Sequence, residues 1–415
     1  MKKTICELFA GVGGFRLGME RANKEWTTVW ANQWEPGKKS QYAYDCYCAH
    51  FGKTDNHVNK NISEIDKALI PDHNLLVGGF PCQDYSVART GATGINGKKG
   101  VLWWDIRDIL EKKSPSFVIL ENVDRLLKSP ANQRGRDFGI ILTCFNELGY
   151  NVEWRVINAA EYGFAQRRRR TFIFAYKNET SYSNHISKSV ARPDCVFNNV
   201  GFFAHTFKIV GVSNDDIRST VLTESDLADV TEHFSYAFGN AGFMFNGTIY
   251  TCDTTPIYEE STILRTLLDK NVDKRFYLGN NLDKWKYLKG AKKIERTSKT
   301  GHTYTFSEGS IAFPDPIDKP ARTMLTSESS LNRSTHVIED PQTKQLRLLT
   351  PIEAERIQGF DDDWTNTGMP EKFRYFCMGN ALVVGLITRM GTYLNTIFDR
   401  EATHVAEDNK TREAM

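Results

Sequence analysis

The first 177 residues alternate short apolar runs with longer segments that have helix-like spacing. The apolar runs predict strands at 4–9, 27–31, 74–77, 117–120, 151–158 and 171–176. The longer segments predict helices at 15–23, 39–51, 102–112 and 137–148. Strands and helices that alternate in this way predict an α/β domain with a doubly wound, mostly parallel sheet.

The pattern changes after Lys177, where Ser, Asn and Asp become more frequent and the strand-like pieces become short and irregular. We therefore predict a catalytic and cofactor-binding domain at 1–177 and a second, smaller domain at 178–339. A C-terminal segment, 340–400, is expected to return to the first domain, with helices from Thr350–Pro351 to 357 and over 381–398. The charged stretch 401–415 is expected to be a disordered tail.

Composition narrows the class of protein. The chain has 415 residues, 40% of them hydrophobic and 25% charged, with a formal net charge of +2. No apolar run approaches the ~20 residues of a membrane span, so we expect no membrane association. The eight cysteines lack the paired spacing of a zinc site or a disulfide framework. We therefore expect no metal and a reducing, cytoplasmic location.

Basic residues gather in two places, although the total charge is almost balanced. One is the run Arg167–Arg170, and the other is the segment 284–299, where lysines alternate with Trp285 and Tyr287. Local basic patches attract a polyanion even when acidic residues elsewhere cancel the sum. The second patch also fits a solvated helix face, so both readings stay open.

The turn that follows the strand at 74–77 is the strongest candidate for chemistry. Gly78 and Gly79 interrupt the apolar run, and Pro81 fixes the backbone directly before Cys82. Open α/β sheets place their chemistry at the carboxyl ends of strands, where a thiolate is a strong nucleophile. A buried cysteine is often only a small hydrophobe, but this context favours the catalytic reading.

A second turn, Phe9–Phe15, contains Gly11, Gly13 and Gly14 between a strand and a helix. Such a turn lets a nucleotide-like ligand approach the backbone, or simply packs a helix on a sheet. The next strand ends at Gln33–Trp34, where these folds place ribose-binding side chains. Trp34 either stacks on an adenine ring or belongs to the core.

Two polar groups mark other strand ends. Glu121 follows the strand at 117–120, and a carboxyl group there can protonate a ring nitrogen. In the run Gln166–Thr171, strand alternation predicts that Gln166, Arg168 and Arg170 share one face. Facing a pocket, the two arginines would donate to a carbonyl oxygen and to a carboxylate.

Taken together, these motifs resemble the bacterial DNA (cytosine-5)-methyltransferases from Phe9 to about Val384, outside the region 178–339. Residues 79–83 match the nucleophile motif of the family, 121–123 its ENV motif and 166–170 its QxRxR motif. Residues 349–360 resemble the ninth motif and 379–381 the tenth. The order of the motifs along the chain makes a chance match very improbable.

The resemblance implies a fold that binds S-adenosyl-L-methionine, with S-adenosyl-L-homocysteine as the product and no metal. The implied cofactor-binding residues are Phe9, Gly11, Gly13, Gly14, Gln33, Trp34, Asn61, Ile62, Pro81, Leu102, Asn380 and Ala381. Gln33 and Asn61 stand where the family usually has acids, although Glu35 lies close enough to substitute for the first. Both amides keep a carbonyl acceptor, so we expect these two replacements to affect the affinity for the cofactor and not the reaction itself.

The resemblance also implies catalytic roles. Cys82 would add to C6 of a flipped-out cytosine, Glu121 would act at N3, Arg170 would hold O2 and Arg168 would orient Glu121. The implied partner is double-stranded DNA, with target recognition in the region 178–339, and a cognate restriction endonuclease would act separately from a monomeric enzyme in the bacterial cytoplasm or nucleoid. The expected DNA-binding residues are Gln83, Ser86, Arg89, Lys98, Lys99, Lys284, Lys289, Lys293 and Arg322.

Three other functions remain open from the sequence. The same residues could methylate cytosine in RNA, although the long recognition region favours duplex DNA. A catalytically silent DNA-binding regulator conflicts with the intact set Cys82, Glu121 and Arg170. A dinucleotide oxidoreductase conflicts with the incomplete glycine fingerprint of the turn Phe9–Phe15.

Overall fold

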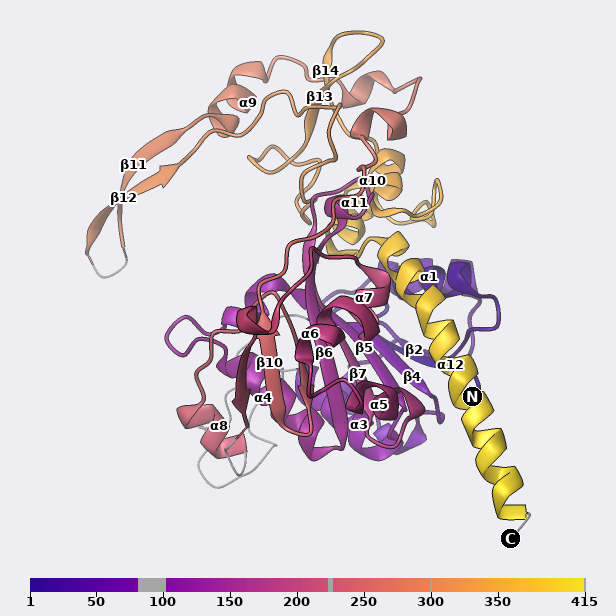
Figure 1. Cartoon of the computed structure of the whole chain (residues 1–415). Coiled ribbons are helices and arrows are strands. Elements are labelled where there is room, and N and C mark those ends of the chain that lie inside the picture. The colour runs from indigo at the N-terminus through magenta and orange to yellow at the C-terminus, as the bar shows by residue number, and fades with distance from the viewer. Residues whose placement is uncertain (81–101, 223–226, 299–300, 414–415) are drawn as a thin grey trace. The chain divides into compact units, whose positions relative to one another are not determined.

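The computed structural model describes residues 1–80, 102–222, 227–298 and 301–413, with the backbone alone over 404–413. It divides the chain into two units (Figure 1). Unit 1 consists of Met1–Tyr162, Arg169–Glu259 and Val384–Met415, and unit 2 of Gly163–Arg168 and Glu260–Val383.

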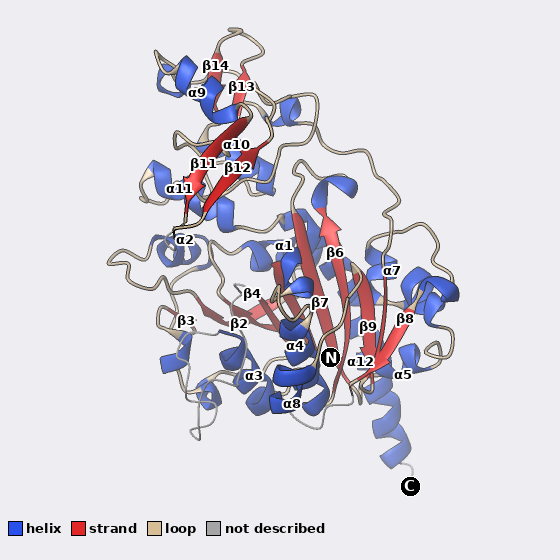
Figure 2. Ribbon diagram, turned by 90° about the vertical axis from the view of Figure 1, so that its left-hand side faces the viewer, coloured by secondary structure: helices blue, strands red, loops and turns tan. Residues whose placement is uncertain are grey.

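Unit 1 is built on one large mixed sheet, which has ten strands in the described part of the chain (Figure 2). Its strand order is β3-β2-β1-β4-β5-β7-β6-β9-β10-β8. The parallel strands are β1 (Thr4–Leu8), β2 (Thr27–Asn32), β3 (His57–Val58), β4 (Leu75–Gly79) and β5 (Phe117–Val123). The antiparallel strands are β6 (Tyr150–Asn158), β7 (Arg169–Lys177), β8 (Arg218–Val221), β9 (Ala241–Phe245) and β10 (Thr248–Cys252). The predicted doubly wound α/β class is confirmed, but only half of the sheet is parallel.

Alternation along the strands buries both faces of this sheet. On β5, Val118 and Leu120 belong to a core shared with α3 (Leu102–Lys113) and α4 (Arg136–Glu147). Phe117 points to the opposite face, where its ring lies 5.1 Å from that of Phe398 on α12. Helices on both faces explain why β5 is apolar at successive positions rather than at every second one.

The remaining helices of unit 1 are mostly short, apart from the long C-terminal helix. They are α1 (Gly14–Ala22), α2 (Tyr42–Phe51), α5 (Ser181–Ser187), α6 (Pro193–Cys195), α7 (Phe202–Thr206), α8 (Leu227–His233) and α12 (Val384–Glu413). Helix α12 packs closely against α1: a Cβ atom added at Gly18 would lie 2.6 Å from Cβ of Ile387. The sequence predicted a disordered tail at 401–415, but α12 continues to Glu413.

The boundary between the units differs from the predicted boundary at residue 178. Strands β8, β9 and β10 lie within 178–259 and extend the large sheet of unit 1, because β9 pairs with β6 along Val152–Arg155. Their strand-like segments are short and lie among Ser, Asn and Asp residues, so the sequence indicated an irregular domain. In the structure β9 and β10 are largely buried, and the last strand, β8, is mostly exposed, as is usual for an edge strand.

Unit 2 contains two small hairpins and three α-helices among its described residues, besides short 3₁₀ helices at Leu264–Leu267 and Lys274–Phe276. The hairpins are β11 (Lys292–Thr297) with β12 (Thr303–Glu308), and β13 (Val337–Glu339) with β14 (Leu346–Leu348). The helices are α9 (Leu282–Lys289), α10 (Pro351–Gln358) and α11 (Glu371–Asn380). The predicted start of α10 is confirmed: Glu353 N–H donates to Thr350 Oγ1 (3.2 Å), and Thr350 N–H donates to Glu353 Oε2 (2.8 Å). Helix α11 was not predicted.

No single helix of the described chain meets the length and hydropathy expected of a membrane span, while the bent pair α11 and α12 meets both by length and composition. The described residues also contain no group of three or more His, Cys, Asp or Glu side chains arranged to hold a metal ion.

Glu153 is a carboxyl group inside unit 1, on β6. Its Oε1 accepts a hydrogen bond from the hydroxyl of Tyr182 (2.7 Å), and only 3% of the residue is exposed. Burial raises the pKa of Glu153 to about 7, although the Tyr182 hydroxyl and backbone N–H groups oppose this shift. Glu153 is therefore a proton-binding site of the folded state.

We predict that Glu153→Gln flattens the dependence of stability on pH. Because the folded-state pKa of about 7 exceeds the ordinary 4.5, the protonated carboxyl stabilises the fold at low pH. This contribution, on the order of 3 kcal/mol, is lost as the pH rises through 7. Urea unfolding between pH 5 and pH 8 measures the slope.

The matched control is Glu179→Gln, because Glu179 is exposed. Glu7, whose pKa burial also raises to about 7, remains in both variants, so some slope persists. Equal slopes for Glu153→Gln and the wild type would contradict the prediction.

Candidate active site

The carboxyl ends of β4 and β5 lie side by side at the edge where the sequence predicted the chemistry. Gly79 at the end of β4 pairs in register with Glu121, and Phe80 N–H donates to the Glu121 carbonyl (3.3 Å). The next residues, 81–101, lie outside the described residues. This segment contains Pro81, Cys82, Gln83, Ser86, Arg89, Lys98 and Lys99, so their roles stay predictions.

Glu121 forms an ion pair with Arg170 of β7. Arg170 Nε lies 2.7 Å from Glu121 Oε1, and the two side chains are 18% and 15% exposed. The second carboxylate oxygen faces Gly79, where an added Cβ would lie 3.1 Å from Oε2. Glycine at this position therefore leaves room for the carboxylate. A fixed carboxyl and a fixed guanidinium can together hydrogen-bond the edge of a planar heterocycle.

The sequence assigned the orientation of Glu121 to Arg168, but the structure gives this contact to Arg170. Strand β7 begins only at Arg169, so the expected alternation does not extend back to Gln166 and Arg168. Arg168 is buried in unit 2 and donates to the carbonyls of Met324 (3.2 Å), Gly379 (3.0 Å) and Asn380 (3.4 Å). Arg168 therefore has a structural role within unit 2, and the catalytic role predicted for it stays a prediction.

The glycine turn after β1 has the backbone that its sequence predicts. Phe9, Gly11 and Gly13 all have positive φ angles, of 54°, 58° and 89°. An added Cβ at Gly13 would lie 2.3 Å from the ring of Phe51, so this position accepts only glycine. At Gly11 the space is open within 4 Å, which leaves the turn accessible to a ligand. Gly14 begins α1 directly behind it.

Gln33 is tied to this turn, because its Oε1 accepts a hydrogen bond from Gly11 N–H (2.7 Å). One lone pair of the expected ribose acceptor is therefore already used, while the amide NH₂ group can still donate. Trp34 next to it is 37% exposed, so the core alternative for this residue is wrong. One carboxylate oxygen of Glu35 is buried without a hydrogen-bond partner in the described structure, and burial raises the pKa of this group.

The other expected cofactor residues lie in both units. Asn61 Oδ1 accepts from Ser63 N–H (3.3 Å), and Ile62 is 2% exposed. Leu102 is the first residue of α3. Asn380 and Ala381 belong to unit 2, at the end of α11.

A buried polar network beneath the glycine turn was not predicted. Glu7 on β1 accepts from Tyr47 Oη (2.9 Å) and from Arg16 N–H (3.4 Å). The Arg16 guanidinium lies 4.3 Å from the centroid of the Phe51 ring and 3.1 Å from His57 Nε2. The signal for this network was available, since Glu7 is a charged residue within an apolar strand.

The four described residues that were predicted to bind DNA fall into two groups. Lys284 and Lys293 are exposed and stay candidates. Lys289 is 1% exposed, and its Nζ donates to the Thr335 carbonyl and lies 3.7 Å from Asp315 Oδ2. Burial lowers the pKa of Lys289 to about 8.

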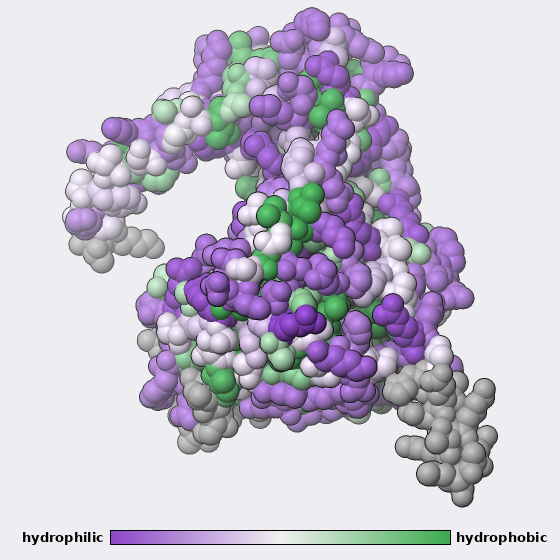
Figure 3. Space-filling view, in the orientation of Figure 1, coloured by the Kyte–Doolittle hydropathy of each residue, from purple (hydrophilic) through white to green (hydrophobic). Residues whose placement is uncertain are grey.

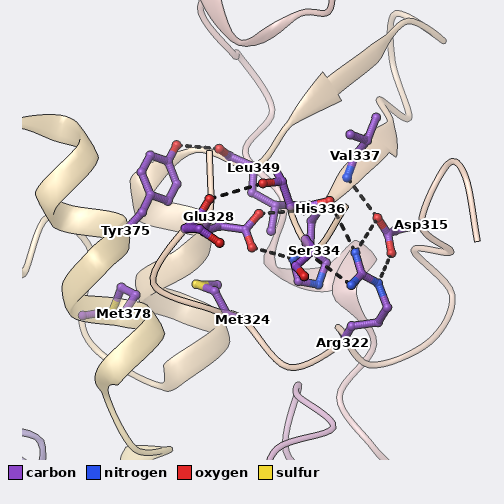
Figure 4. Close-up of polar contacts among 12 residues, drawn as sticks. Asp315, Arg322, Met324, Glu328, Ser334, His336, Val337, Leu349, Tyr375 and Met378 are labelled. Carbon is purple, nitrogen blue, oxygen red and sulfur yellow. Dashed lines mark hydrogen bonds and ion pairs between the residues drawn. The ribbon is translucent and has the colours of Figure 1, made fainter. Parts of the chain in front are cut away.

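Asp315 is also the partner of Arg322, with 2.5 Å between Arg322 Nε and Asp315 Oδ1 (Figure 4). In the same close-up, Val337 N–H donates to Asp315 Oδ2 (3.0 Å), and the buried pair His336 and Glu328 lies beside it. Lys289 and Arg322 therefore hold unit 2 together. The burial of Lys289 contradicts its assignment as a DNA contact, whereas Arg322, whose side chain is 20% exposed, stays a candidate. A basic residue on a predicted surface helix gives no sign in the sequence that it is buried.

The fold and the site define a class of protein. A Rossmann-like sheet, a glycine turn after β1 and a carboxyl–guanidinium pair at the carboxyl edge are those of an S-adenosylmethionine-dependent methyltransferase. The fold is similar to that of the Dnmt2 methyltransferase of S. pombe, with a TM-score of 0.56 and 15% identity over 96% of this chain and 98% of that chain. A mutant DNMT2 of Spodoptera frugiperda gives a TM-score of 0.58 and 14% identity, over 95% and 99%.

A profile of the C-5 cytosine-specific DNA methylases matches residues 3–395. The chain belongs to this family and is a DNA (cytosine-5-)-methyltransferase. It is 52% identical to the type II methyltransferase M.Sau3AI of Staphylococcus aureus, over 95% of this chain and 96% of the relative. It is 27% identical to M.NlaX of Neisseria lactamica, over 96% and 99%. The family implies S-adenosylmethionine as the methyl donor and DNA as the substrate.

We predict that Arg170→Gln lowers the rate of methyl transfer by about 100-fold, because it removes a charged partner from the reacting site. Cofactor affinity should change less than twofold. Single-turnover transfer of labelled methyl groups and equilibrium cofactor binding measure the two quantities.

Arg169→Gln is the matched control: its ion pair with Asp124 is long, at 3.4 Å, and its side chain is 55% exposed. This neighbour should stay within about threefold of the wild-type rate. Equal losses in the two variants would show that the run of arginines acts only through its total charge.

A second pair of variants compares two lysines of α9. Lys289→Ala should lower the free energy of unfolding by about 3 kcal/mol, because it leaves Asp315 buried with one partner fewer. Lys284→Ala should change it by less than ~0.5 kcal/mol, since Lys284 is exposed. Denaturant unfolding of both variants checks the comparison, and similar values for the two would contradict the burial of Lys289.

Proposed function

We propose that the protein transfers a methyl group from S-adenosylmethionine to C5 of a cytosine within a specific short sequence of double-stranded DNA. The observation that carries the proposal is the Glu121–Arg170 pair, in register with the strand that leads through Gly79 to Cys82. Since a cytosine inside a duplex is out of reach, the base is flipped out at a cost of a few kcal/mol.

The residues of this chain then act on the flipped ring. The Cys82 thiolate gives an electron pair to C6 and forms an S–C6 bond, which turns C5 into an enamine-like nucleophile. Glu121 donates a proton or a hydrogen bond to N3, and Arg170 donates to O2 while it holds Glu121. After C5 has gained the methyl group, a base takes the C5 proton. The freed electron pair restores the C5–C6 double bond and expels the thiolate.

The residues around the glycine turn fit the cofactor. S-adenosylmethionine supplies an electrophilic sulfonium methyl group when bound. The open space at Gly11, the exposed ring of Trp34 and the unpartnered oxygen of Glu35 suit a nucleoside with a positively charged chain. We assign the same site to Phe9, Gly13, Gly14, Gln33, Asn61, Ile62, Pro81 and Leu102, while the cofactor-binding role of Asn380 and Ala381 in unit 2 stays a prediction from the sequence.

We further propose that unit 2 selects the DNA sequence and that the methylation protects host or phage DNA from a separate restriction endonuclease. The basic segment 284–299, which lies in unit 2, supports the first part. The part of the predicted recognition region that lies in unit 2 is 260–339. The type II names of the relatives support the second part.

Cys82→Ser tests the central step, because a hydroxyl is a far weaker nucleophile than a thiolate at neutral pH. We expect turnover on duplex DNA to fall by at least about 1,000-fold, with cofactor binding unchanged. Single-stranded DNA and RNA serve as parallel substrates, and preferential methylation of RNA would refute the proposed substrate.

A trapping experiment gives an independent result. Duplex DNA with 5-fluorocytosine at the target should form a denaturation-resistant adduct with the wild type, since fluorine cannot leave as a proton does. The serine variant should form none. Absence of an adduct with an active wild type would rule out the covalent route.

A further inference from the structure

The β11–β12 hairpin of unit 2 has two faces of different character. Cross-strand pairs in register place six side chains on one face, and all six are polar and exposed: Lys293, Glu295, Thr297, Thr303, Thr305 and Ser307. Within the described chain, two of these side chains contact each other, with Thr297 Oγ1 3.4 Å from Thr303 Oγ1. This face therefore presents donors and acceptors that the fold itself hardly uses.

The opposite face carries the contacts that hold the two strands together. Ile294 lies opposite Phe306, and both are half-buried. The guanidinium of Arg296 lies 3.7 Å from the centroid of the Phe306 ring. At the start of β11, Lys292 Nζ lies 4.6 Å from the centroid of the Tyr287 ring on α9. Among the described residues of the hairpin, the packing contacts therefore lie on this opposite face rather than on the polar one.

The base of the hairpin is fixed to the rest of unit 2. Arg333 donates to the carbonyls of Leu288 and Gly290, both at 3.1 Å, and to that of Gly309. Ile311 N–H donates to the Lys289 carbonyl (3.0 Å), next to the buried ammonium group described above. A two-stranded hairpin alone is only marginally stable in water, so these contacts fix the direction in which it projects.

Beyond its base, the hairpin extends from α9 as a separate arm (Figure 1). Its visible surface is mainly hydrophilic or neutral (Figure 3). Three exposed lysines lie on the hairpin or on the neighbouring helix α9, namely Lys284, Lys286 and Lys293. The size and charge of this arm fit duplex DNA, whose major groove admits a two-stranded β-ribbon between two rows of phosphates.

We propose that the β11–β12 hairpin enters the major groove of the substrate DNA and reads base edges with its polar face. Glu295 and Thr305, which are direct cross-strand partners near its middle, supply a carboxylate acceptor and a hydroxyl group for this readout. Lys293 on the same face contacts a phosphate. The inference rests on the proposed function and adds the element that determines specificity.

The test is the double variant Glu295→Ala/Thr305→Ala. The quantity measured is kcat/KM for methylation of the cognate duplex, divided by kcat/KM for duplexes with one base pair of the site changed. This ratio should fall by about tenfold at one or two positions of the site and stay unchanged at the others. Thr305→Val, which keeps a strand-forming side chain but removes the hydroxyl, should show part of the same effect.

The matched control is Gln342→Ala/Gln345→Ala, which removes two exposed polar side chains from the turn of the other hairpin in unit 2. It should leave the ratio unchanged. Thermal unfolding should be the same for all variants, because every altered side chain is exposed. Lys293→Gln should instead reduce, by about 0.9, the slope of the logarithm of the DNA-binding constant against the logarithm of the salt concentration. This reduction should be the same for every DNA sequence.

Two results would overturn the inference: an unchanged ratio in Glu295→Ala/Thr305→Ala, or an equal loss of kcat/KM on every duplex. Both results overturn the inference only when the wild type, measured in parallel, methylates its duplex site. A wild type that methylates no duplex DNA would refute the proposed function itself, so the two failures are distinguishable.

Discussion

The ion pair between Glu121 and Arg170 is the interaction on which the rest of the site depends. Its 2.7 Å contact joins strands that run in opposite directions, and it exists because β5 pairs with β7 over the whole length of β5. The side chains are mostly removed from water, where their attraction is stronger and less screened by salt than on an open surface. Gly79 completes the arrangement because a side chain there would crowd the carboxylate. The large sheet thus fixes the only two catalytic candidates that share a described contact.

Buried charge recurs throughout both units, and each instance has partners. Glu7 and Glu153 lie in the core of unit 1 with tyrosine hydroxyls as donors. In unit 2, Arg347 is fully buried between Asp340 and Glu353, at 2.8 and 2.7 Å. Removing one partner of such a pair leaves an uncompensated charge, which costs far more than the intact pair contributes. These networks explain how a small unit with short strands keeps a defined shape: directional polar contacts replace part of an apolar core.

The same reasoning separates the two kinds of basic residue in unit 2. Lys289 and Arg322 converge on Asp315 and stabilise the unit from within, whereas Lys284 and Lys293 remain in water. The backbone carbonyl of Lys289 and the guanidinium of Arg333 anchor the base of the β11–β12 hairpin, whereas the outer group lies in water on the hairpin and on the neighbouring helix α9. Lys289 therefore stabilises the unit, whereas Lys284 and Lys293 stay available for DNA, and the sequence alone does not distinguish these lysines.

The sequence by itself determined what depends on neighbouring residues. Apolar runs located the strands at 4–9 and 117–120 within a few residues, glycines marked the turn after Phe9, and Thr350–Pro351 marked the start of α10. These features follow from backbone preferences over a few residues. Tertiary structure decided which residues become partners across long separations. Arg168 donates to the carbonyl of Gly379, 211 positions away, and the described ion pair of Glu121 is with Arg170. Strands β8–β10 join the sheet of unit 1 because β9 finds a free edge at β6. Pairing of this kind depends on where whole elements meet in space, so the spacing of residues along the chain does not predict it.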